Sequence, residues 1–594
     1  MFYNHVDFIK IFIHMTKNLQ TLIFFLKTEN IQAYVITSYD EYLSEYTSSK
    51  RNRLKIITNF SGSNGIAIIF TQQKSLFFTD GRYLLQAQKE LDKQYFEIHD
   101  LQFIKNFDWS KYITLEKQHF FINPLICNQQ ILSLFPKIKM EFLEKDIIED
   151  MLGDKFNSSI EVFEYSEYYS GEDYLSKVSK IREFLRKSQF ENILLTNPEN
   201  ISWLLNLRSW DLEFTPTLLS AMLISQTRSY VFLDKDLTIS EQVKLARSSL
   251  EFISISKLNS FLLNLEYNCI YDKNSNCYIS NILSTNPKNK AIDDPCTVWK
   301  LKKNDSEILH ATNINKIDSV AVCEFLAFIQ DENKNSTLHN YSEYNLIEKL
   351  NYFRSQNSQF IKNSFHPICG FRSNAAIIHY KASKENSDLI SKSGLLLIDS
   401  GGQYLGGTTD LTRTVAVGVV SSRHKYFYTK ILKGHLSINQ LIFPKNKLNG
   451  SHIDSFARFH LWQDFLDYPH STGHGVSNFL NVHESGLSIS PTAKEILLDD
   501  NMILSNEPGL YIEGEFGIRI ENLIMTKSTS DKNFLKFQNL TLVPYDKQLI
   551  DKKLLTEKEI EYINAYYEDV MKYIYPELSK RAQKWMKDQI NFMN

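Results

Sequence analysis

The sequence predicts an α/β protein of several domains, the last of which has an α+β arrangement. Its 594 residues, of which 43% are hydrophobic, are too many for one core and suggest two to four domains. In the first 300 residues, short apolar runs typical of strands alternate with segments of helical spacing. Further along the chain, several apolar runs end at acidic residues beside glycine-rich turns.

A first α/β domain is predicted over residues 15–165. Leu22–Leu26 belong to an expected apolar helix, and Ala33–Ile36 predict a strand. The runs Gly65–Phe70 and Ser75–Phe78, separated by a short polar segment, predict a hairpin.

Residues 1–14 are predicted to be a disordered extension ahead of this domain. They contain His5, Asp7 and His14 and lack a small-residue cleavage site, so they make a poor signal peptide. We therefore expect Met15 to be the authentic start of the protein. A peptide from upstream of Met15 in a mass spectrum would refute this expectation.

A second α/β domain is predicted over residues 166–300. Helical spacing over Lys177–Arg186 is followed by apolar runs such as Ile193–Leu195. Trp203 is expected in the core rather than at a ligand. The stretch Asn286–Pro295 carries two prolines and is expected to be a linker.

Residues 301–594 are predicted to form a third domain. Its first helix begins at Asn304, where Glu307 completes a capping-box signal. A second helix is expected to follow Ser342 and to extend to Phe353. From there to the end of the acidic motifs, strand and turn signals dominate. Helical spacing returns near the C-terminus, over residues 557–568 and 582–590.

The composition excludes several classes of function. A net charge of −3 gives no electrostatic basis for binding nucleic acid. No run reaches 18 apolar residues, so neither a membrane span nor a membrane partner is expected. Six cysteines without CxxC pairing predict free, mostly buried thiols in a reducing compartment, which favours a cytoplasmic protein. The densest basic cluster is expected to be a solvated edge; it comprises Lys50, Arg51, Arg53 and Lys55.

Four acidic residues and one histidine gather between apolar runs of the third domain. They are Asp399, Asp410, His474, Glu507 and Glu521. Acids on apolar strands are costly to bury unless something neutralises them, and their mutual repulsion would raise several carboxyl pKa values. Two divalent cations balance four carboxylates, and an oxygen-rich site with one imidazole suits Mn²⁺, Co²⁺ or Zn²⁺. Two ions about 3.5–4 Å apart can turn bound water into hydroxide near neutral pH, which points to a hydrolase.

Local patterns indicate how these residues meet. Leu395–Ile398 predict a buried strand, and glycine pairs beyond it permit a tight return. Asp399 and Asp410 are therefore expected on facing arms of a hairpin, close enough to share an ion. In GIRIENL, period-2 alternation places Arg519 and Glu521 on one face.

The order and the contexts of the five residues resemble the ligand motifs of the pita-bread metallopeptidases. These contexts are IDSGGQY, GTTDLTRT, TGHGV, NEPG and RIEN. Within that group the chain most closely resembles the long, three-domain Xaa-Pro aminopeptidases, because TDGRYLLQA, NPENISWLLNLR and TLVPYDKQLID also match. The resemblance runs from residue 15 to the end of the chain. It implies two creatinase-type N-terminal α/β domains, followed by a pita-bread catalytic domain with a C-terminal helical segment.

The resemblance also implies the role of each ligand. Asp399 would bind one ion, while His474 and Glu507 would bind the other, and Asp410 and Glu521 would bridge both. Mn²⁺ is the preferred cofactor, with Zn²⁺ and Co²⁺ as alternatives. Glu507 is also the expected general base, which takes a proton from the attacking water.

Further residues are assigned to the substrate on the same basis. The resemblance places His379, His470 and His483 at the peptide; His379 is expected at the end of an apolar strand. Arg519 is expected to orient a carboxylate through charge-assisted hydrogen bonds. For Arg82 two alternatives stay open, namely a surface arginine paired with Asp80 or an arginine that reaches the substrate.

The implied activity is removal of the N-terminal residue from peptides whose second residue is proline, by a cytoplasmic homodimer. Residue chemistry alone supports only a dinuclear metallohydrolase. HExxH and GxSxG motifs are absent from the sequence, so neither that class of zinc protease nor a serine hydrolase is predicted. Two rivals remain, an Xaa-Pro dipeptidase and a non-catalytic pita-bread module that binds peptides.

Overall fold

The structure, a computed structural model, describes residues 17–113, 119–152, 160–391 and 393–591. The predicted extension over residues 1–14 and the expected start at Met15 lie outside the described residues. The chain forms two compact units, each described here by itself. The first comprises Met1–Glu164, Tyr174–Glu213 and Thr217–Asp294, and the second comprises Tyr165–Asp173, Phe214–Pro216 and Pro295–Asn594. The division of the chain into domains at residues 165 and 300 stays a prediction.

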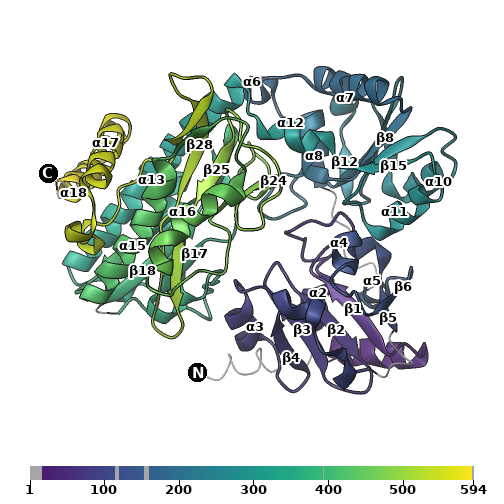
Figure 1. Ribbon diagram of the computed structural model, residues 1–594, viewed down its shortest axis with the longest axis horizontal. Helices are drawn as coiled ribbons and strands as arrows, with labels where there is room; N and C mark the ends of the chain where they lie inside the picture. Colours follow the sequence, from purple (N-terminus) through teal and green to yellow (C-terminus); the bar gives the residue numbers. More distant parts are fainter. Residues whose placement is uncertain (1–16, 114–118, 153–159, 392, 592–594) are drawn as a thin grey trace. The chain divides into compact units, whose positions relative to one another are not determined.

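The first unit contains two six-stranded mixed sheets (Figure 1). In the first sheet β1 pairs antiparallel with β2, and β2 pairs antiparallel with β3, which confirms the predicted strand and hairpin. Helix α2 (Arg53–Thr58) and helix α3 (Leu84–Glu90) belong to the same part of the unit. The strand order is β4 (Phe96–Asp100), β3 (Ser75–Thr79), β2 (Ile66–Phe70), β1 (Ala33–Thr37), β5 (His119–Ile122) and β6 (Lys139–Phe142).

The second sheet occupies part of the predicted linker, while the division between the two compact units falls at its end, between Asp294 and Pro295. Within Asn286–Pro295, β15 (Lys290–Ile292) pairs in parallel with β14 (Cys269–Asp272). Lys290 and Ala291 are exposed on this edge strand, so the segment lacks the apolar pattern of a strand. Trp203 is buried in α8 (Pro198–Leu205), as expected. The order of the sheet is β13 (Glu251–Ser254), β11 (Ser229–Leu233), β10 (Ser220–Ser225), β8 (Asn192–Leu195), β14 and β15.

Lys55 of the basic cluster is exposed as expected, but the two arginines are not part of a solvated edge. The Arg51 guanidinium lies 2.5 Å from a carboxylate oxygen of Asp234. Arg53, only 4% exposed, binds Asp146 at 2.6 Å and also pairs with Glu41. The acids come from other parts of the first unit, so charge patterning along the sequence could not reveal that both arginines are paired, with Arg53 buried and Arg51 partly buried.

The described residues of the second unit form one six-stranded sheet, two three-stranded sheets and one two-stranded sheet. A three-stranded antiparallel sheet has the order β17 (Ile368–Phe371), β18 (Gly394–Ser400) and β21 (Leu411–Val417). The six-stranded sheet has the order β22 (Ile442–Pro444), β29 (Phe534–Asn539), β28 (Asn522–Ser528), β25 (Ile503–Asn506), β23 (Gly473–Gly475) and β24 (Glu484–Ile489). The other two sheets are β16 (Phe360–Asn363) with β19 (Gly402–Tyr404) and β20 (Gly407–Thr408), and β26 (Gly509–Ile512) with β27 (Phe516–Arg519).

Four predicted helices of this unit are confirmed. The first begins after Asn304, whose side chain accepts from the Glu307 N–H while Glu307 caps the Asn304 N–H in return. The four are α13 (Asp305–Lys334), α14 (Glu343–Ser355), α17 (Glu557–Tyr573) and α18 (Lys580–Ile590).

Strands and turns dominate after Phe353, as expected, but two helices that were not predicted interrupt that stretch. They are α15 (Ser422–Asn439) and α16 (Gly450–Trp462), which pack side by side (Figure 1). Their aromatic, histidine and serine residues are modest helix formers. Tertiary packing stabilises both helices instead, since Ile438 and Ile453 share one apolar core with the six-stranded sheet.

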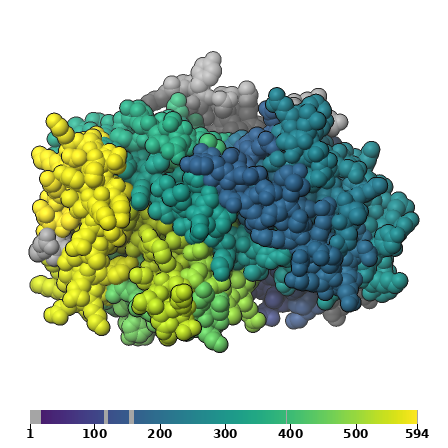
Figure 2. All heavy atoms as spheres, turned by 90° about the horizontal axis from the view of Figure 1, so that it is seen from above, coloured from purple at the N-terminus to yellow at the C-terminus, as the bar shows by residue number. Residues whose placement is uncertain are grey.

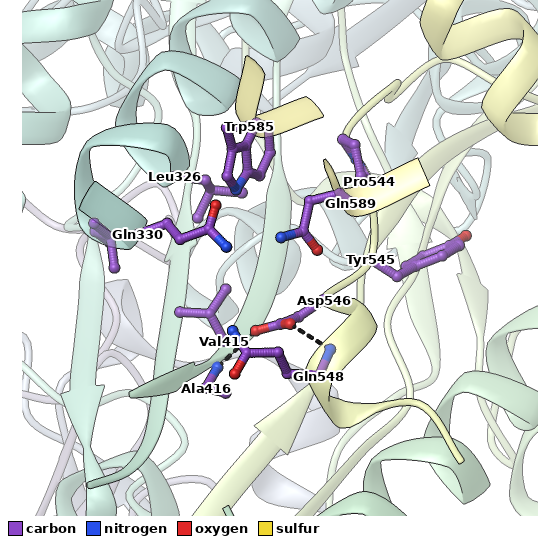
Figure 3. Close-up of a pocket in the computed structure, with 11 residues that line it drawn as sticks. Leu326, Gln330, Val415, Ala416, Pro544, Tyr545, Asp546, Gln548, Trp585 and Gln589 are labelled. Carbon is purple, nitrogen blue, oxygen red and sulfur yellow. Dashed lines mark hydrogen bonds between the residues drawn. The ribbon is translucent and has the colours of Figure 1, made fainter. Parts of the chain in front are cut away.

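The C-terminal residues, yellow in Figure 2, cover one side of the second unit. Ser579 in this region donates to Glu324 of α13 at 2.9 Å. Asp546 accepts hydrogen bonds from the N–H groups of Ala416 and Gln548 (Figure 3), which ties the C-terminal segment to β21. The small cavity around these groups contains none of the predicted site residues.

All six cysteines are described, and all are buried and free of disulfides. This agrees with the expected free thiols. Among the described residues, no helix is both long enough and apolar enough to cross a membrane.

Candidate active site

A β-hairpin carries the first two acids of the predicted site. Strand β18 pairs with β21 so that Asp399 faces Thr412, and Asp410 immediately precedes β21. Both carboxylates are buried. Gly401 permits the tight return, because a Cβ there would lie 1.9 Å from the Thr409 carbonyl oxygen. The acids therefore stand on facing arms of this hairpin.

The six-stranded sheet supplies the imidazole and the third acid. His474 lies on β23, and Glu507 follows β25. His474 Nε2 is 3.4 Å from Asp410 Oδ2 and 3.4 Å from Glu507 Oε1. The other ring nitrogen, Nδ1, donates to the Gly475 carbonyl at 3.0 Å, so Nε2 is the nitrogen available to a ligand.

Glu521 and Arg519 are joined through a threonine hydroxyl. Thr412 Oγ1 donates to Glu521 Oε2 at 2.7 Å and accepts from Arg519 Nε at 3.2 Å. Arg519 Nη2 donates to Asp399 Oδ2 at 2.5 Å. One buried guanidinium thus contacts Asp399 directly and Glu521 through Thr412, which fixes both carboxylates.

The structure brings the five predicted ligands to one place. Asp410, His474 and Glu521 each offer a ligand atom within 4.8 Å of the other two. Glu507 contacts His474, and its negative charge and that of Asp399 both act on Asp410. Residues separated by more than 120 positions therefore form a single anionic cluster.

Burial and neighbouring charges raise the pKa values of Asp410, Glu521 and His474 in this cluster. Burial, with the neighbouring charge of Asp399, raises the pKa of Asp410 to about 6, although the hydrogen bond with His474 opposes this. Burial and the charges of Asp410 and Glu507 hold the pKa of Glu521 well above its usual range. Burial alone would lower the pKa of His474, but the hydrogen bond to Asp410 and the charge of Glu507 raise it to about 9.

The donor set fits a pair of divalent cations. Among the described residues, neither Asp399 Oδ1 nor Asp410 Oδ1 has a hydrogen-bond partner, although both atoms are buried. Buried anionic oxygens need a positive partner. Four carboxylates and one neutral imidazole would balance two divalent ions of the Mn²⁺, Zn²⁺ or Co²⁺ type.

Two of the three predicted substrate histidines contact the site or its supporting residues. The ring centroid of His483 lies 4.3 Å from that of His474, in an edge-on arrangement. His470 Nδ1 lies 2.8 Å from the Ser471 carbonyl oxygen, and its Nε2 lies 2.9 Å from the Tyr511 hydroxyl. That hydroxyl also accepts from Arg519 Nη1 at 2.6 Å, so His470 is connected to the same guanidinium as Asp399.

The local structure predicted for His379 is wrong, because this residue does not end a strand. It lies in a turn after the 3₁₀ helix η7 (Arg372–Ala376). The buried Glu343 carboxylate accepts from the Phe371 N–H at 2.7 Å and from the Tyr380 hydroxyl at 2.8 Å. These contacts from α14 bend the apolar segment, and its sequence gives no sign of them.

Sequence reasoning missed two residues of the site, Thr412 and Tyr511. Thr412 stands two positions after Asp410 and presents its hydroxyl to Glu521, so period-2 alternation along β21 could have identified it. Tyr511 carries no comparable signal, since only the fold brings its hydroxyl to His470 and Arg519.

Arg82 lies in the first unit. Its Nε and Nη2 donate to the two carboxylate oxygens of Asp80 at 2.9 and 2.8 Å. This is the paired arrangement that the first of the two alternatives describes.

Comparisons with known proteins agree with this geometry. The sequence model of metallopeptidase family M24 matches residues 310–528, and that of its C-terminal region matches residues 533–592. Creatinase/prolidase N-terminal domains match residues 18–121 and 154–307. Xaa-Pro aminopeptidase 1 of Dictyostelium discoideum is 34% identical over 97% of this chain and 96% of its own.

This chain belongs to the Xaa-Pro aminopeptidase family of M24 metallopeptidases.

Other members support the assignment. A probable Xaa-Pro aminopeptidase P of Laccaria bicolor is 33% identical, over 97% of this chain and 93% of its own. The X-prolyl aminopeptidase of Caenorhabditis elegans, described as a cytosolic enzyme with a di-nuclear active site, superposes with a TM-score of 0.86. It is 27% identical and covers 94% of this chain and 95% of its own. The predicted family and its creatinase and pita-bread fold are confirmed.

A dipeptidase is similar over a smaller part. The Xaa-Pro dipeptidase of Bacillus anthracis covers 63% of this chain and 99% of its own, with a TM-score of 0.50 and 24% identity, which indicates a shared fold. The aminopeptidases therefore match a much larger share of this chain than the dipeptidase does.

Proposed function

We propose that this protein is a metalloaminopeptidase that hydrolyses the N-terminal Xaa–Pro bond of peptides. The observation that carries the proposal is the convergence of three buried carboxylates, the partly buried Glu507 and His474 on one cluster, in a chain similar to Xaa-Pro aminopeptidases over nearly its full length. Proline forms a tertiary amide without an N–H, and it restricts the backbone, so general peptidases act on it poorly. A dedicated enzyme is therefore required.

The five ligands would divide two ions between them. We assign Asp399 to one ion, His474 and Glu507 to the other, and Asp410 and Glu521 to a bridging position. Mn²⁺ is the proposed metal, with Zn²⁺ and Co²⁺ as alternatives, because oxygen donors predominate. When bound, the pair supplies Lewis-acid polarisation of the scissile carbonyl and activation of a water molecule.

Glu507 is the proposed general base. Ser505 Oγ donates to Glu507 Oε1 at 3.1 Å, which leaves the second carboxylate oxygen to take a proton from the attacking water. The same carboxyl group can then deliver that proton to the leaving nitrogen of proline. Such transfers contribute about 10²–10⁴-fold to a rate.

The three histidines are proposed to contact the peptide. His483, whose ring lies beside that of His474, is proposed to donate to the oxyanion of the tetrahedral intermediate, which neutral or charged imidazole can do. His470 and His379 are proposed as further contacts of the substrate. Arg519 holds Asp399 in place, and Arg82 is proposed as a contact to longer peptides, although its pair with Asp80 supports a structural role equally.

The decisive experiment compares dipeptides with longer peptides. We expect the Mn²⁺-loaded protein to cleave Arg-Pro-Pro at its first bond, whereas an Xaa-Pro dipeptidase would cleave Arg-Pro alone. Asp410→Ala should abolish turnover and leave the fold intact, as judged by circular dichroism. Absence of both bound metal and peptidase activity after Mn²⁺ addition would instead favour the non-catalytic peptide-binding module.

We also propose that the protein is a cytoplasmic homodimer. Helix α16 exposes three aromatic side chains at intervals of three residues, Phe456, Phe459 and Trp462, and Phe465 is exposed just beyond the helix. All residues of this helix are described. Its other exposed residues, His452 and Ser455, carry neither an acidic group nor the permanent charge of lysine or arginine. An apolar face without like charges can pack against a copy of itself, as two-fold interfaces require. The cytosolic description of the nematode relative supports the location.

A further inference from the structure

Lys303 and Glu484 form a buried ion pair beside the candidate active site, and Lys300 Nζ also lies 3.3 Å from Glu484 Oε1. Lys303 Nζ donates to Glu484 Oε1 at 2.7 Å and to Oε2 at 2.8 Å. Its third donor goes to the carbonyl oxygen of Lys300 at 2.8 Å. Each side chain of the pair is 1% exposed. The ammonium group therefore uses all its donors, and both carboxylate oxygens are held.

Both ends of this pair are anchored in the second unit. Lys303 lies between α12 (Pro295–Leu301) and α13, and its N–H donates to the Asn501 carbonyl at 2.9 Å. Glu484 is the first residue of β24 and faces Gly475 of β23. A Cβ on Gly475 would lie 3.2 Å from the Glu484 Cβ, so the two strands are in close contact. Lys303 thus fixes the start of β24 against β23.

That point lies next to two histidines of the site. The register of β23 and β24 shifts between His474 and Gly475, an irregularity of the kind that re-aims side chains near active sites. His483 directly precedes Glu484, and its ring packs edge-on against the ring of His474. The backbone that sets the direction of the His483 ring is therefore attached to the carboxylate that Lys303 holds.

Stability alone does not account for the pair. Buried ion pairs are often replaced by apolar residues of similar size without loss of stability, because two charges must be removed from water. A lysine that hydrogen-bonds to both oxygens of one carboxylate does, however, fix the position of that carboxylate. Because Glu484 directly follows His483, this also restrains the backbone that carries the His483 ring.

We propose that Lys303 is a positioning residue that, through Glu484, holds His483 in the orientation that turnover requires. The inference rests on the proposed function, in which His483 contacts the substrate. Lys303 hydrogen-bonds to Glu484, Lys300 and Asn501, none of which is a predicted metal ligand.

The first test uses the full-length, Mn²⁺-loaded protein and two adjacent lysines. Lys303→Met removes the ammonium and keeps the length of the side chain. Lys302→Met is the matched control, since Lys302 is half exposed and pairs with Asp499 at 3.0 Å. We expect Lys303→Met to lower kcat on Arg-Pro-Pro by about 10- to 100-fold, as for other residues that orient a site, with little change in KM or in metal content. Lys302→Met should match the wild type.

A double-mutant cycle tests whether Lys303 acts through His483. In a His483→Gln background, Lys303→Met should lower kcat by less than about threefold, because the group it positions is already gone. Losses that multiply would overturn the inference. If His483→Gln has wild-type turnover, the proposed role of His483 is wrong and the inference fails with it. If His483→Gln is impaired while Lys303→Met matches Lys302→Met, only the inference is wrong.

Substitutions by uncharged residues separate positioning from folding. Lys303→Met with Glu484→Gln would leave the charge of Lys300, which lies 3.3 Å from Glu484 Oε1 and is 1% exposed, without its Glu484 partner. Adding Lys300→Met removes that charge, so the Tm of the triple variant should exceed that of the double variant. We expect the kcat of the triple variant to remain low, because the hydrogen bonds between Lys303 and the Glu484 carboxylate are lost. Recovery of kcat together with Tm would show that the pair is merely structural and would overturn the inference.

Discussion

Replacing Thr412 by valine removes one hydroxyl from the candidate metal centre and keeps the shape of the side chain. Thr412 is fully buried. Its hydroxyl donates to Glu521 at 2.7 Å and accepts from Arg519 at 3.2 Å. The change therefore takes a donor from a carboxylate that must be ionised to bind metal, and an acceptor from a buried guanidinium.

The expected magnitude follows from these contacts. A hydrogen bond to a charged group contributes about 1.5–3 kcal/mol. At 1.4 kcal/mol for each factor of ten, metal should bind about 10- to 100-fold more weakly. The pKa of Glu521, which burial already raises, should rise further, because the Thr412 hydrogen bond lowers it. A proton would then compete more strongly with the ion.

The assay is a titration of chelator-treated protein with Mn²⁺, followed by calorimetry. Thr412→Ser keeps the hydroxyl and should bind metal nearly as the wild type does. Thr37→Val is a second control, since Thr37 in the first unit is also buried and donates to the Ile126 carbonyl at 2.7 Å. Wild-type metal affinity in Thr412→Val would refute the assigned role of the Thr412–Glu521 contact.

Three further predictions concern pH, backbone packing and assembly. In the metal-free protein the folded pKa values of Asp410, about 6, and His474, about 9, exceed the ordinary values of 3.8 and 6.5. The folded state therefore holds protons that the unfolded state has lost, and Tm should fall as pH rises from 4 to 6 and from 6.5 to 9; an equally steep fall in Mn²⁺-loaded protein would contradict this. Gly473→Ala would place a Cβ 2.0 Å from the Ser505 carbonyl oxygen, so it should lower both Tm and metal content, and a variant with normal metal content would refute the close approach. Trp462→Asp should give a particle of 69.4 kDa by light scattering where the wild type gives twice that mass, and an unchanged mass would exclude this face of α16 from the interface.

Interactions between residues that are close in the chain were sufficient to predict part of the fold. Capping at Asn304 depends on Glu307 three residues away, and the hairpin of β2 and β3 depends on two neighbouring apolar runs. Helices α15 and α16 escaped detection because their stability comes from a shared core, to which Ile438 and Ile453 contribute, rather than from propensity. The turn at His379 escaped detection for a similar reason, since Glu343 of α14 imposes it.

The sequence by itself determined the family and the five candidate ligands, because each ligand stands in a short motif whose residues are neighbours in the chain. Only the tertiary structure decided how these motifs are supported. It showed that Thr412 and Arg519 join Asp399 to Glu521, and that Arg51 and Arg53 are paired with distant acids. The physical reason is distance along the chain: hydrogen bonds and ion pairs between residues 93 to 183 positions apart leave no trace in the spacing of either residue.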